Sequence, residues 1–257
     1  MESRFSLIDD AWIPIAGVCR VSLEQIFTHP EYRFLGGNPV QKIALLKLLL
    51  AVAQAAATPS NEEEWLAMGS HGLAEKCLFY LKKWHDRFYL YGEKPFLQMP
   101  EISSAALQRF GALLPEIATG NTTVHMQSQV EKKLDDADKA LLIVTLMGFA
   151  LGGKKVDNSI LLTKGYQGKT KAGKPGTAVA HMGLLHNFLW GATLWDTIWL
   201  NLLTHENLSG FGLFSEGVGT APWECMPDGE DCIIARQLKK TLMGRLIPLC
   251  RFCLLNP

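Results

Sequence analysis

The spacing of hydrophobic and polar residues changes along the chain, and each pattern predicts a different element. Residues 5–15 and 18–21 are rich in β-branched and aromatic side chains, and Gly17 separates the two runs. Such side chains favour strands, and a glycine between two short runs favours a turn. The N-terminus is therefore expected to form a short β-hairpin or pair of strands.

Helical spacing dominates the rest of the chain. From Val40 to Ala57 apolar residues recur at helical intervals, and Asn38-Pro39 before them supplies an N-cap and a first-turn proline. The three glutamates 62–64 suit the positive end of a following helix. Further helices are predicted at about 73–85, 135–151, 182–203 and 232–242, with residues 87–98 extended around a turn at Gly92 and 120–133 in a polar loop.

These elements predict an α+β fold, a predominantly helical globular domain with short N-terminal strands. We find no internal repeat and no convincing linker, so residues 1–257 are treated as one domain. The most apolar stretches, 48–53 and 141–151, fall well short of the roughly 20 residues that a membrane span needs. With no basic and apolar leader ahead of its six cysteines, we expect a soluble cytoplasmic protein with reduced thiols and no membrane partner.

Charge is balanced overall, with 25 Lys plus Arg against 25 Asp plus Glu. Hydrophobic residues make up 48% and charged residues 19%, which excludes a disordered chain. A net charge of zero also argues against a uniformly basic nucleic-acid binder, but it leaves the local distribution open.

One segment, residues 152–176, departs strongly from this balance. It contains six glycines and six lysines but a single acid, Asp157. Glycines let backbone N–H groups approach a partner closely, and lysines supply mobile charges suited to phosphate oxygens. The segment suits a loop that lies on a nucleic-acid backbone or in a minor groove, whose degenerate pattern needs few side chains. Composition alone slightly favours the plainer interpretation, a solvated loop whose lysines aid solubility.

Other chemistry finds less support. Gly168–Pro175 has proline where a phosphate-binding P-loop needs Ser or Thr, and no strand precedes a GxGxxG. Cys225, Cys232, Cys250 and Cys253 make a four-thiolate zinc site conceivable, but their spacing and apolar neighbours favour free thiols. The seven histidines form no HExxH or HxH pattern, so no metal and no catalytic residue is assigned. The tryptophans 190, 195 and 199 are expected in the core or at an interface rather than stacked on bases.

Several short motifs occur in an order that points to one family. They are Leu7–Pro14 (LIDDAWIP), Gly92–Gln98 (GEKPFLQ), Gly120–Thr123 (GNTT), Phe149–Gly153 (FALGG), Leu194–Leu202 (LWDTIWLNL), Ala221–Glu224 (APWE) and Gly244–Cys253 (GRLIPLCRFC). Together they resemble the CasA-type large subunit of the type I-E CRISPR surveillance complex, Cascade. The order of the motifs across nearly the whole chain, rather than any single one, makes the resemblance specific.

The resemblance implies a non-catalytic subunit of an RNA-guided complex, without a cofactor. Its implied partners are guide RNA, double-stranded target DNA, the other Cascade subunits and a helicase-nuclease. In the family a glycine-rich loop contacts the protospacer-adjacent motif, and the subunit aids strand separation and recruits the nuclease. The matching residues here are Lys164, Gly165, Gly168, Lys169, Lys171, Gly173, Lys174 and Gly176.

A second family loop docks the subunit near the 5′ handle of the guide. Its counterpart is expected at residues 120–129, with Asn121, Thr122, Val124 and His125 as candidates. Family members are considerably longer, and the C-terminal helical bundle of the family has no counterpart in residues 1–257, which correspond to the N-terminal domain. A scaffold module that binds only protein subunits is the alternative function.

Overall fold

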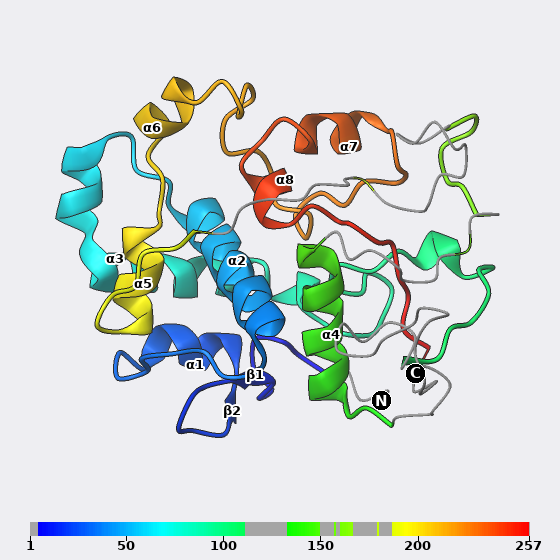
Figure 1. Ribbon diagram of the computed structural model, residues 1–257, viewed down its shortest axis with the longest axis horizontal. Helices are drawn as coiled ribbons and strands as arrows, with labels where there is room; N and C mark the ends of the chain where they lie inside the picture. The colour runs from blue at the N-terminus through cyan, green and yellow to red at the C-terminus, as the bar shows by residue number, and fades with distance from the viewer. Residues whose placement is uncertain are drawn as a thin grey trace, which may run out of the picture.

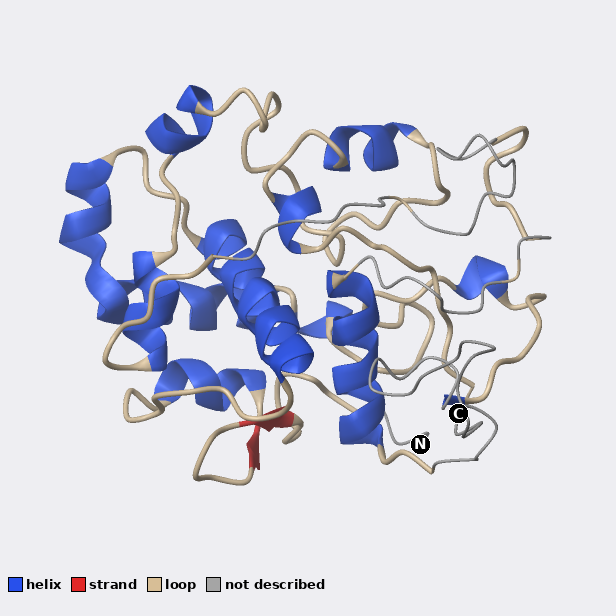
Figure 2. Cartoon of the chain, in the orientation of Figure 1, coloured by secondary structure: helices blue, strands red, loops and turns tan. Residues whose placement is uncertain are grey.

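The structure, a computed structural model, describes residues 5–110, 133–149, 157, 160–166, 179 and 187–256. Within them the chain is mostly helical, with one two-stranded antiparallel sheet, which confirms the predicted fold class (Figure 2). The elements are β1 (Ile13–Pro14), β2 (Arg20–Val21), α1 (Leu23–Thr28), α2 (Pro39–Ala56), α3 (Glu62–Lys83), two 3-10 turns (His85–Arg87 and Pro100–Ile102), α4 (Asp136–Gly148), α5 (Leu194–Leu200), α6 (His205–Gly210), α7 (Ile233–Leu238) and α8 (Met243–Leu246).

The predicted N-terminal hairpin is present. β1 and β2 pair antiparallel, with Ile13 opposite Val21, and Gly17 lies in the turn between them with φ +77°. That left-handed conformation suits glycine, which has no Cβ to clash with the backbone. Confirmation here reflects a local signal, because the two strands and their turn are contiguous in sequence.

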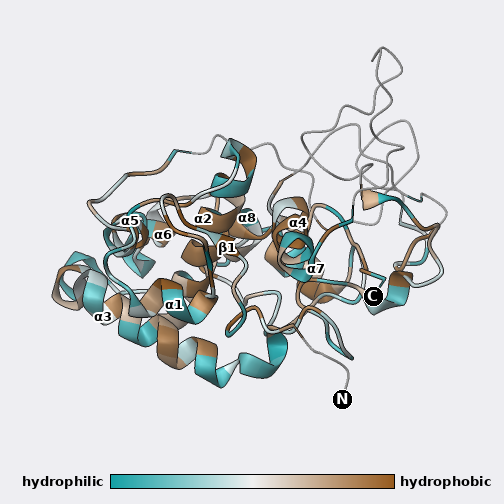
Figure 3. Ribbon diagram, turned by 90° about the horizontal axis from the view of Figure 1, so that it is seen from below, coloured by the Kyte–Doolittle hydropathy of each residue, from teal (hydrophilic) through white to brown (hydrophobic). Residues whose placement is uncertain are grey.

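Helix α2 forms the centre of the core. The Asn38 side chain accepts from the Gln41 amide and the Gln41 side chain accepts from the Asn38 amide, a capping box that confirms the predicted start. Every residue from Ala44 to Gln54 is buried, and Figure 3 shows the helix hydrophobic over its visible surface. Among the described residues α2 is the one helix long and apolar enough to cross a membrane, but 61% of it is buried inside the protein, as in a core helix.

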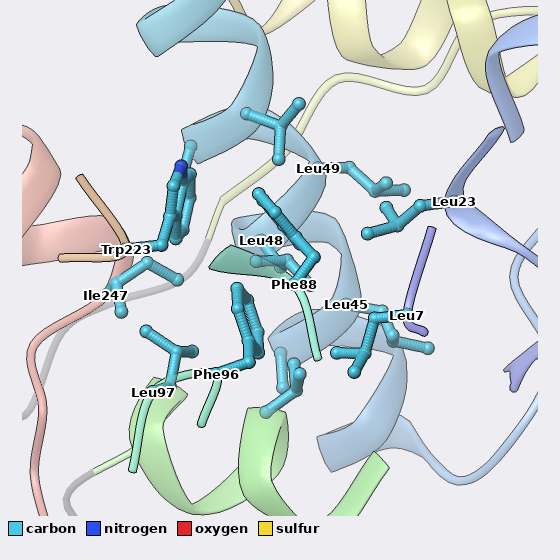
Figure 4. Packing of buried hydrophobic residues seen from close by; sticks show 14 of the residues in the cluster. Leu7, Leu23, Leu45, Leu48, Leu49, Phe88, Phe96, Leu97, Trp223 and Ile247 are labelled. Atoms are coloured by element: carbon cyan, nitrogen blue, oxygen red, sulfur yellow. The ribbon is translucent and has the colours of Figure 1, made fainter. Parts of the chain in front are cut away.

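Aromatic side chains from distant segments pack against α2. Figure 4 shows Phe88, Phe96 and Trp223 gathered near Leu48. The Phe88 and Phe96 rings stack with centroids 4.8 Å apart, and the Phe96 and Trp223 centroids are 5.8 Å apart. This cluster ties residues 88–97 and the segment around Trp223 to one core.

Helices α2 and α4 lie side by side and meet at small residues and a buried charge (Figure 1). A Cβ added at Gly148 would lie 3.3 Å from the Ala44 Cβ, so glycine permits the close approach. The Lys47 ammonium donates to the Gly148 carbonyl at 2.6 Å, which satisfies a carbonyl left open at the end of α4. Burial lowers the pKa of Lys47 to about 8, and the neighbouring Cys250 partly opposes that shift.

The helix predicted at 182–203 is wrong over its described first part. Residues 187–193 are not helical, and α5 begins only at Leu194, where Thr193 and Asp196 form a capping box. The Gly191 amide donates to the Thr197 hydroxyl at 3.0 Å, and a Cβ on Gly191 would lie 2.4 Å from the Asp196 Cβ. The chain thus crosses the start of α5 instead of continuing it.

Other helix predictions hold with altered bounds. The helices predicted from Glu62 and at 73–85 are both present as the two parts of α3, which are separated by a kink at the non-helical Gly69 (φ +59°). The helix predicted at 135–151 ends at Gly148, and the one predicted at 232–242 spans only α7, with Cys232 as its N-cap. The short helices α1 and α6 were not predicted, although the capping boxes that begin them at Ser22 and Thr204 are visible in the sequence.

Candidate nucleic-acid interface

Within residues 152–176, which we call the Gly/Lys segment, residues 163–166 form a tight turn. The Tyr166 amide donates to the Thr163 carbonyl at 3.2 Å, and Gly165 adopts φ +77° at the turn. Lys164 and Gly165 are exposed, and Lys164 makes no ion pair with another described residue. The first two of the predicted contact residues therefore lie on the surface, available to a partner.

A buried carboxylate holds the start of this turn through hydrogen bonds to its backbone. Glu230 is fully buried, and its two carboxylate oxygens accept the backbone amides of Leu162 at 3.1 Å and Thr163 at 2.8 Å. Hydrogen bonds to an ionised acceptor are stronger than neutral ones, and two adjacent amides fix the direction of the chain. We call this arrangement the Glu230 strap.

The residues beside Glu230 complete the strap. The Thr163 hydroxyl accepts from the Asp231 amide at 3.1 Å. A Cβ added at Gly229 would lie 2.6 Å from the Thr163 hydroxyl oxygen, so only glycine lets the two segments approach this closely. Residues 229–231 and 162–163 are thus joined by both side-chain and backbone contacts.

Charges next to the strap are largely paired. The Asp231 carboxylate contacts Arg236 at 3.0 Å and Lys239 at 3.5 Å, and Lys240 pairs with Glu216 at 2.9 Å. Hydrogen bonding to the Arg236 guanidinium lowers the pKa of Asp231. Lys164, by contrast, makes no ion pair with a described residue.

Tyr166 is held beside the same cluster. The Lys239 ammonium lies 5.9 Å from the centre of the Tyr166 ring, while it donates to the Glu230 carbonyl at 3.1 Å. Burial, followed by the nearby Asp231 and Glu230 carboxylates, raises the pKa of the Tyr166 phenol. Tyr166 therefore stays neutral and offers a ring face and a hydroxyl rather than a charge.

The far end of the segment is tied to the same part of the protein. Val179 is buried, and its amide donates to the Leu249 carbonyl at 3.1 Å. Residues 162–163 of the segment and Val179, just after its end, are therefore all anchored to residues 229–249. The other predicted contact residues, Gly168, Lys169, Lys171, Gly173, Lys174 and Gly176, lie outside the described residues, as do the docking candidates Asn121, Thr122, Val124 and His125.

The thiols do not assemble a metal site within the described residues. All six cysteines are free, and no three His, Cys, Asp or Glu side chains gather closely enough there to hold an ion. Burial raises the pKa of the Cys253 thiol to about 12. The Cys232 sulfur instead accepts the Ala235 amide at the start of α7.

The three tryptophans have different environments. Trp199 stacks on Trp65 with ring centroids 4.0 Å apart, and each indole N–H donates to the other residue's carbonyl. The Trp195 indole donates to the Ile26 carbonyl at 2.6 Å. Trp190 is 55% exposed and meets the Phe34 ring edge-on. Two of the three are thus structural, and Trp190 lies on the surface.

Comparison with known proteins points to one family. The family model described as CRISPR-associated protein Cse1 matches residues 6–257. A CRISPR-associated protein CasA/Cse1 of Thermus thermophilus is 30% identical over 163 residues, which cover 58% of this chain and 32% of that protein.

Solved structures agree with this match. Thermobifida fusca Cse1 gives a TM-score of 0.67 at 24% identity, over 96% of this chain and 47% of its own. Thermus thermophilus CasA (Cse1) gives 0.54 at 26% identity, over 94% and 45%. A chain of a CRISPR RNA-guided surveillance complex gives 0.62 at 17% identity, over 97% and 52%, a likeness of fold.

The chain spans about a third of the Thermus relative and about half of each of these structures. The match nevertheless runs through nearly all of its own length, from the N-terminal hairpin to the residues after α8. The chain belongs to the CRISPR-associated protein Cse1 family.

Proposed function

We propose that this chain is a non-catalytic subunit of an RNA-guided DNA surveillance complex and contacts the duplex at the protospacer-adjacent motif through its Gly/Lys segment. Its residues 1–257 correspond to the N-terminal domain of the large subunit. The contact aids the first strand separation and the recruitment of a helicase-nuclease in antiviral defence. The observation that carries the proposal is the family match over residues 6–257, which includes the whole Gly/Lys segment.

The described geometry supports a contact by this segment. Lys164 and Gly165 are exposed, and the Glu230 strap fixes the two residues that precede them. Lysines that are not paired with acids can replace the counterions of a phosphate backbone, whereas lysines in ion pairs cannot do so without breaking them. A lysine ammonium such as that of Lys164, next to backbone that is held in place, is suited to contact a phosphate.

A neutral body with one positive segment also suits the search for a short motif. In RNA-guided recognition most of the sequence is read by base pairing, so the protein reads only the motif and the backbone. Few phosphate contacts keep non-specific binding weak, and the complex can leave the many sites that lack the motif.

The remaining proposed partners follow from the family. They are the guide RNA and the other subunits, with residues 120–129 docking near the 5′ handle of the guide. We expect the assembly to work in the cytoplasm, where the target DNA and the reduced thiols both belong.

A scaffold role without DNA contact is the second candidate, and one observation favours it. Phe34 and Trp190 are 49% and 55% exposed and touch edge-to-face, with exposed Leu189 next in sequence. Aromatic residues of this kind are enriched where proteins dock on one another.

The salt dependence of duplex binding by the assembled complex distinguishes the two roles. We expect Lys169→Gln, Lys171→Gln and Lys174→Gln together to weaken binding of a motif-bearing duplex and to reduce the salt slope by up to about 3. The matched control replaces Lys42, Lys94 and Lys133 by Gln and should leave both unchanged. If the loop variant keeps the affinity and slope of the wild type, the scaffold role replaces the proposal.

A further inference from the structure

Helix α3 carries an outward face that no described element covers. Beyond the kink at Gly69 it buries Leu73, Ala74, Cys77, Tyr80 and Leu81 against the core. Figure 3 shows α3 at the outer edge of the molecule. Its exposed side presents Phe79 together with Lys76, Lys82 and Lys83, and we call these four residues the α3 face.

Phe79 is 75% exposed, the largest exposure of any aromatic side chain among the described residues. Burial of a phenylalanine contributes about 1.5–3 kcal/mol to folding, and at this position the fold forgoes that gain. A single exposed apolar residue is common on protein surfaces and would carry no inference alone. Its surroundings distinguish this one.

Three lysines surround Phe79 on the same side of the helix. They stand three residues before it, three after it and four after it, which are the spacings of neighbours on a helix surface. None of them makes an ion pair with a described residue, in contrast to Lys239 and Lys240 beside the Glu230 strap. Glu75 is the only acid between residues 75 and 83.

The helix itself explains only part of this arrangement. Lys82 and Lys83 lie in the last turn, where cations interact favourably with the helix dipole. The Lys83 ammonium also lies 5.3 Å from the centre of the Trp84 ring. Neither effect accounts for Lys76, about two turns earlier, or for the exposed ring of Phe79.

We propose that the α3 face binds a single strand of nucleic acid, with one base stacked on Phe79 and the flanking phosphates beside Lys76 and Lys82. This inference rests on the proposed function and adds a second contact, to a strand rather than to the duplex. Surfaces that bind single strands combine positive charge along the backbone with aromatic rings on which bases stack. The rise from Lys76 to Lys82 is about 9 Å, so lysines stand on both sides of the ring.

A single strand fits this face better than a duplex or an acidic protein. In a duplex the base faces are stacked on one another and cannot meet a phenylalanine ring. An acidic protein would pair with the lysines, but it would need an apolar pocket to receive the ring. A planar base requires only the open face that the ring already presents.

The test measures binding of fluorescently labelled oligo(dT) and oligo(rU) to the full chain and to the reconstituted complex at several salt concentrations. We expect Phe79→Ala to weaken binding about five- to hundredfold, the range that one stacked base contributes. Phe79→Tyr should retain it, whereas Phe79→Leu, which keeps the apolar bulk but not the flat ring, should behave like the alanine variant. Whichever of oligo(dT) and oligo(rU) binds more tightly indicates whether the strand is DNA or RNA.

The charge arm uses matched double variants. Lys76→Gln with Lys82→Gln should lower the salt slope by about 1.4, since each contact to a single strand contributes about 0.7. Lys94→Gln with Lys133→Gln removes the same charge elsewhere and should leave the slope unchanged. Phe79 and these lysines are exposed, so circular dichroism should show the wild-type fold in every variant.

Several results would overturn the proposal. Wild-type affinity in Phe79→Ala would do so. Binding by Phe79→Leu as tight as by Phe79→Tyr would also do so, because it would show that no base stacks on the ring. Loss of oligonucleotide binding in the Lys169, Lys171 and Lys174 variant alone would refute the α3 face but not the proposed function. Conversely, the proposed function alone would be refuted if Phe79→Ala weakened single-strand binding while the Lys169, Lys171 and Lys174 variant bound duplex DNA as tightly as the wild type.

Discussion

The Glu230 strap allows the sharpest test of how the Gly/Lys segment is held. In Glu230→Gln one acceptor oxygen remains, so one of the two amides, from Leu162 or Thr163, faces an amide N–H₂ inside the protein. A buried donor left without a partner costs about 1–3 kcal/mol, and the remaining bond loses its charge assistance. Removal of a buried charge offsets part of this loss. In the wild type, however, the carboxylate already accepts two hydrogen bonds, so the cost of the unpaired donor is the larger effect on stability.

We therefore expect Glu230→Gln to lower the free energy of unfolding by about 1–3 kcal/mol in urea denaturation. Hydrogen exchange at the Leu162 and Thr163 amides should accelerate by at least the factor to which this loss of free energy corresponds, about tenfold for each 1.4 kcal/mol, because the strap opens before the whole protein does. Asp231→Asn is the matched control. It removes the same charge one residue away, but from ion pairs near the surface, where water screens the interaction, and it leaves the backbone amides of the strap in place.

Binding gives a second readout that a purely structural change in the core would not produce. The strap positions the segment but contributes no charge to the phosphate contact, so Glu230→Gln should weaken duplex binding without changing the salt slope. If Glu230→Gln and Asp231→Asn unfold alike and the two amides exchange at wild-type rates, the strap does not hold the stem and the reasoning fails.

Three further outcomes follow from the burial or exposure of particular side chains. Burial lowers the pKa of Lys47 to about 8, so the folded protein releases this proton more readily than the unfolded chain does. Burying the charged ammonium therefore destabilises the fold fully below about pH 8, and this loss of stability declines as the pH rises toward the ordinary pKa of 10.5. The unfolding free energy of wild type relative to Lys47→Met should thus rise by about 2.5 kcal/mol from about pH 7 to about pH 10 in urea titrations, and a flat difference would contradict this. Tyr80→Phe removes the acceptor of the buried Trp223 indole, at 2.7 Å, and should cost about 1–3 kcal/mol in thermal unfolding. The double variant with Trp223→Phe should lose less than the sum of the two single variants, and strict additivity would show that the bond is unimportant. Ellman's reagent should react at once with the exposed thiols of Cys19 and Cys225, and the fast phase should vanish when both are Ser. A fast phase that persists in that variant would show that one of the four less exposed thiols is accessible to the reagent.

The local elements of the fold were predictable from the sequence because their signals lie within a few residues. Asn38-Pro39 and the following apolar run predicted α2, and Gly17 between two strand-like runs predicted the hairpin. The helix expected at 182–203 failed because periodicity reports an apolar face but not where the chain turns, and Thr193 with Gly191 decided that point. Composition likewise identified the Gly/Lys segment, since six lysines with one acid is visible without a structure.

What only the tertiary structure decided are contacts between residues far apart in the chain. Glu230 reaches amides 67 and 68 residues away, Lys47 caps a helix end 101 residues away, and Trp65 meets Trp199 across 134 residues. A lone glutamate or lysine in a sequence looks the same whether it is solvated or buried, because its partners are set by packing and not by its neighbours. The sequence by itself therefore determined which segment carries the charge, and the tertiary structure determined what holds that segment in place.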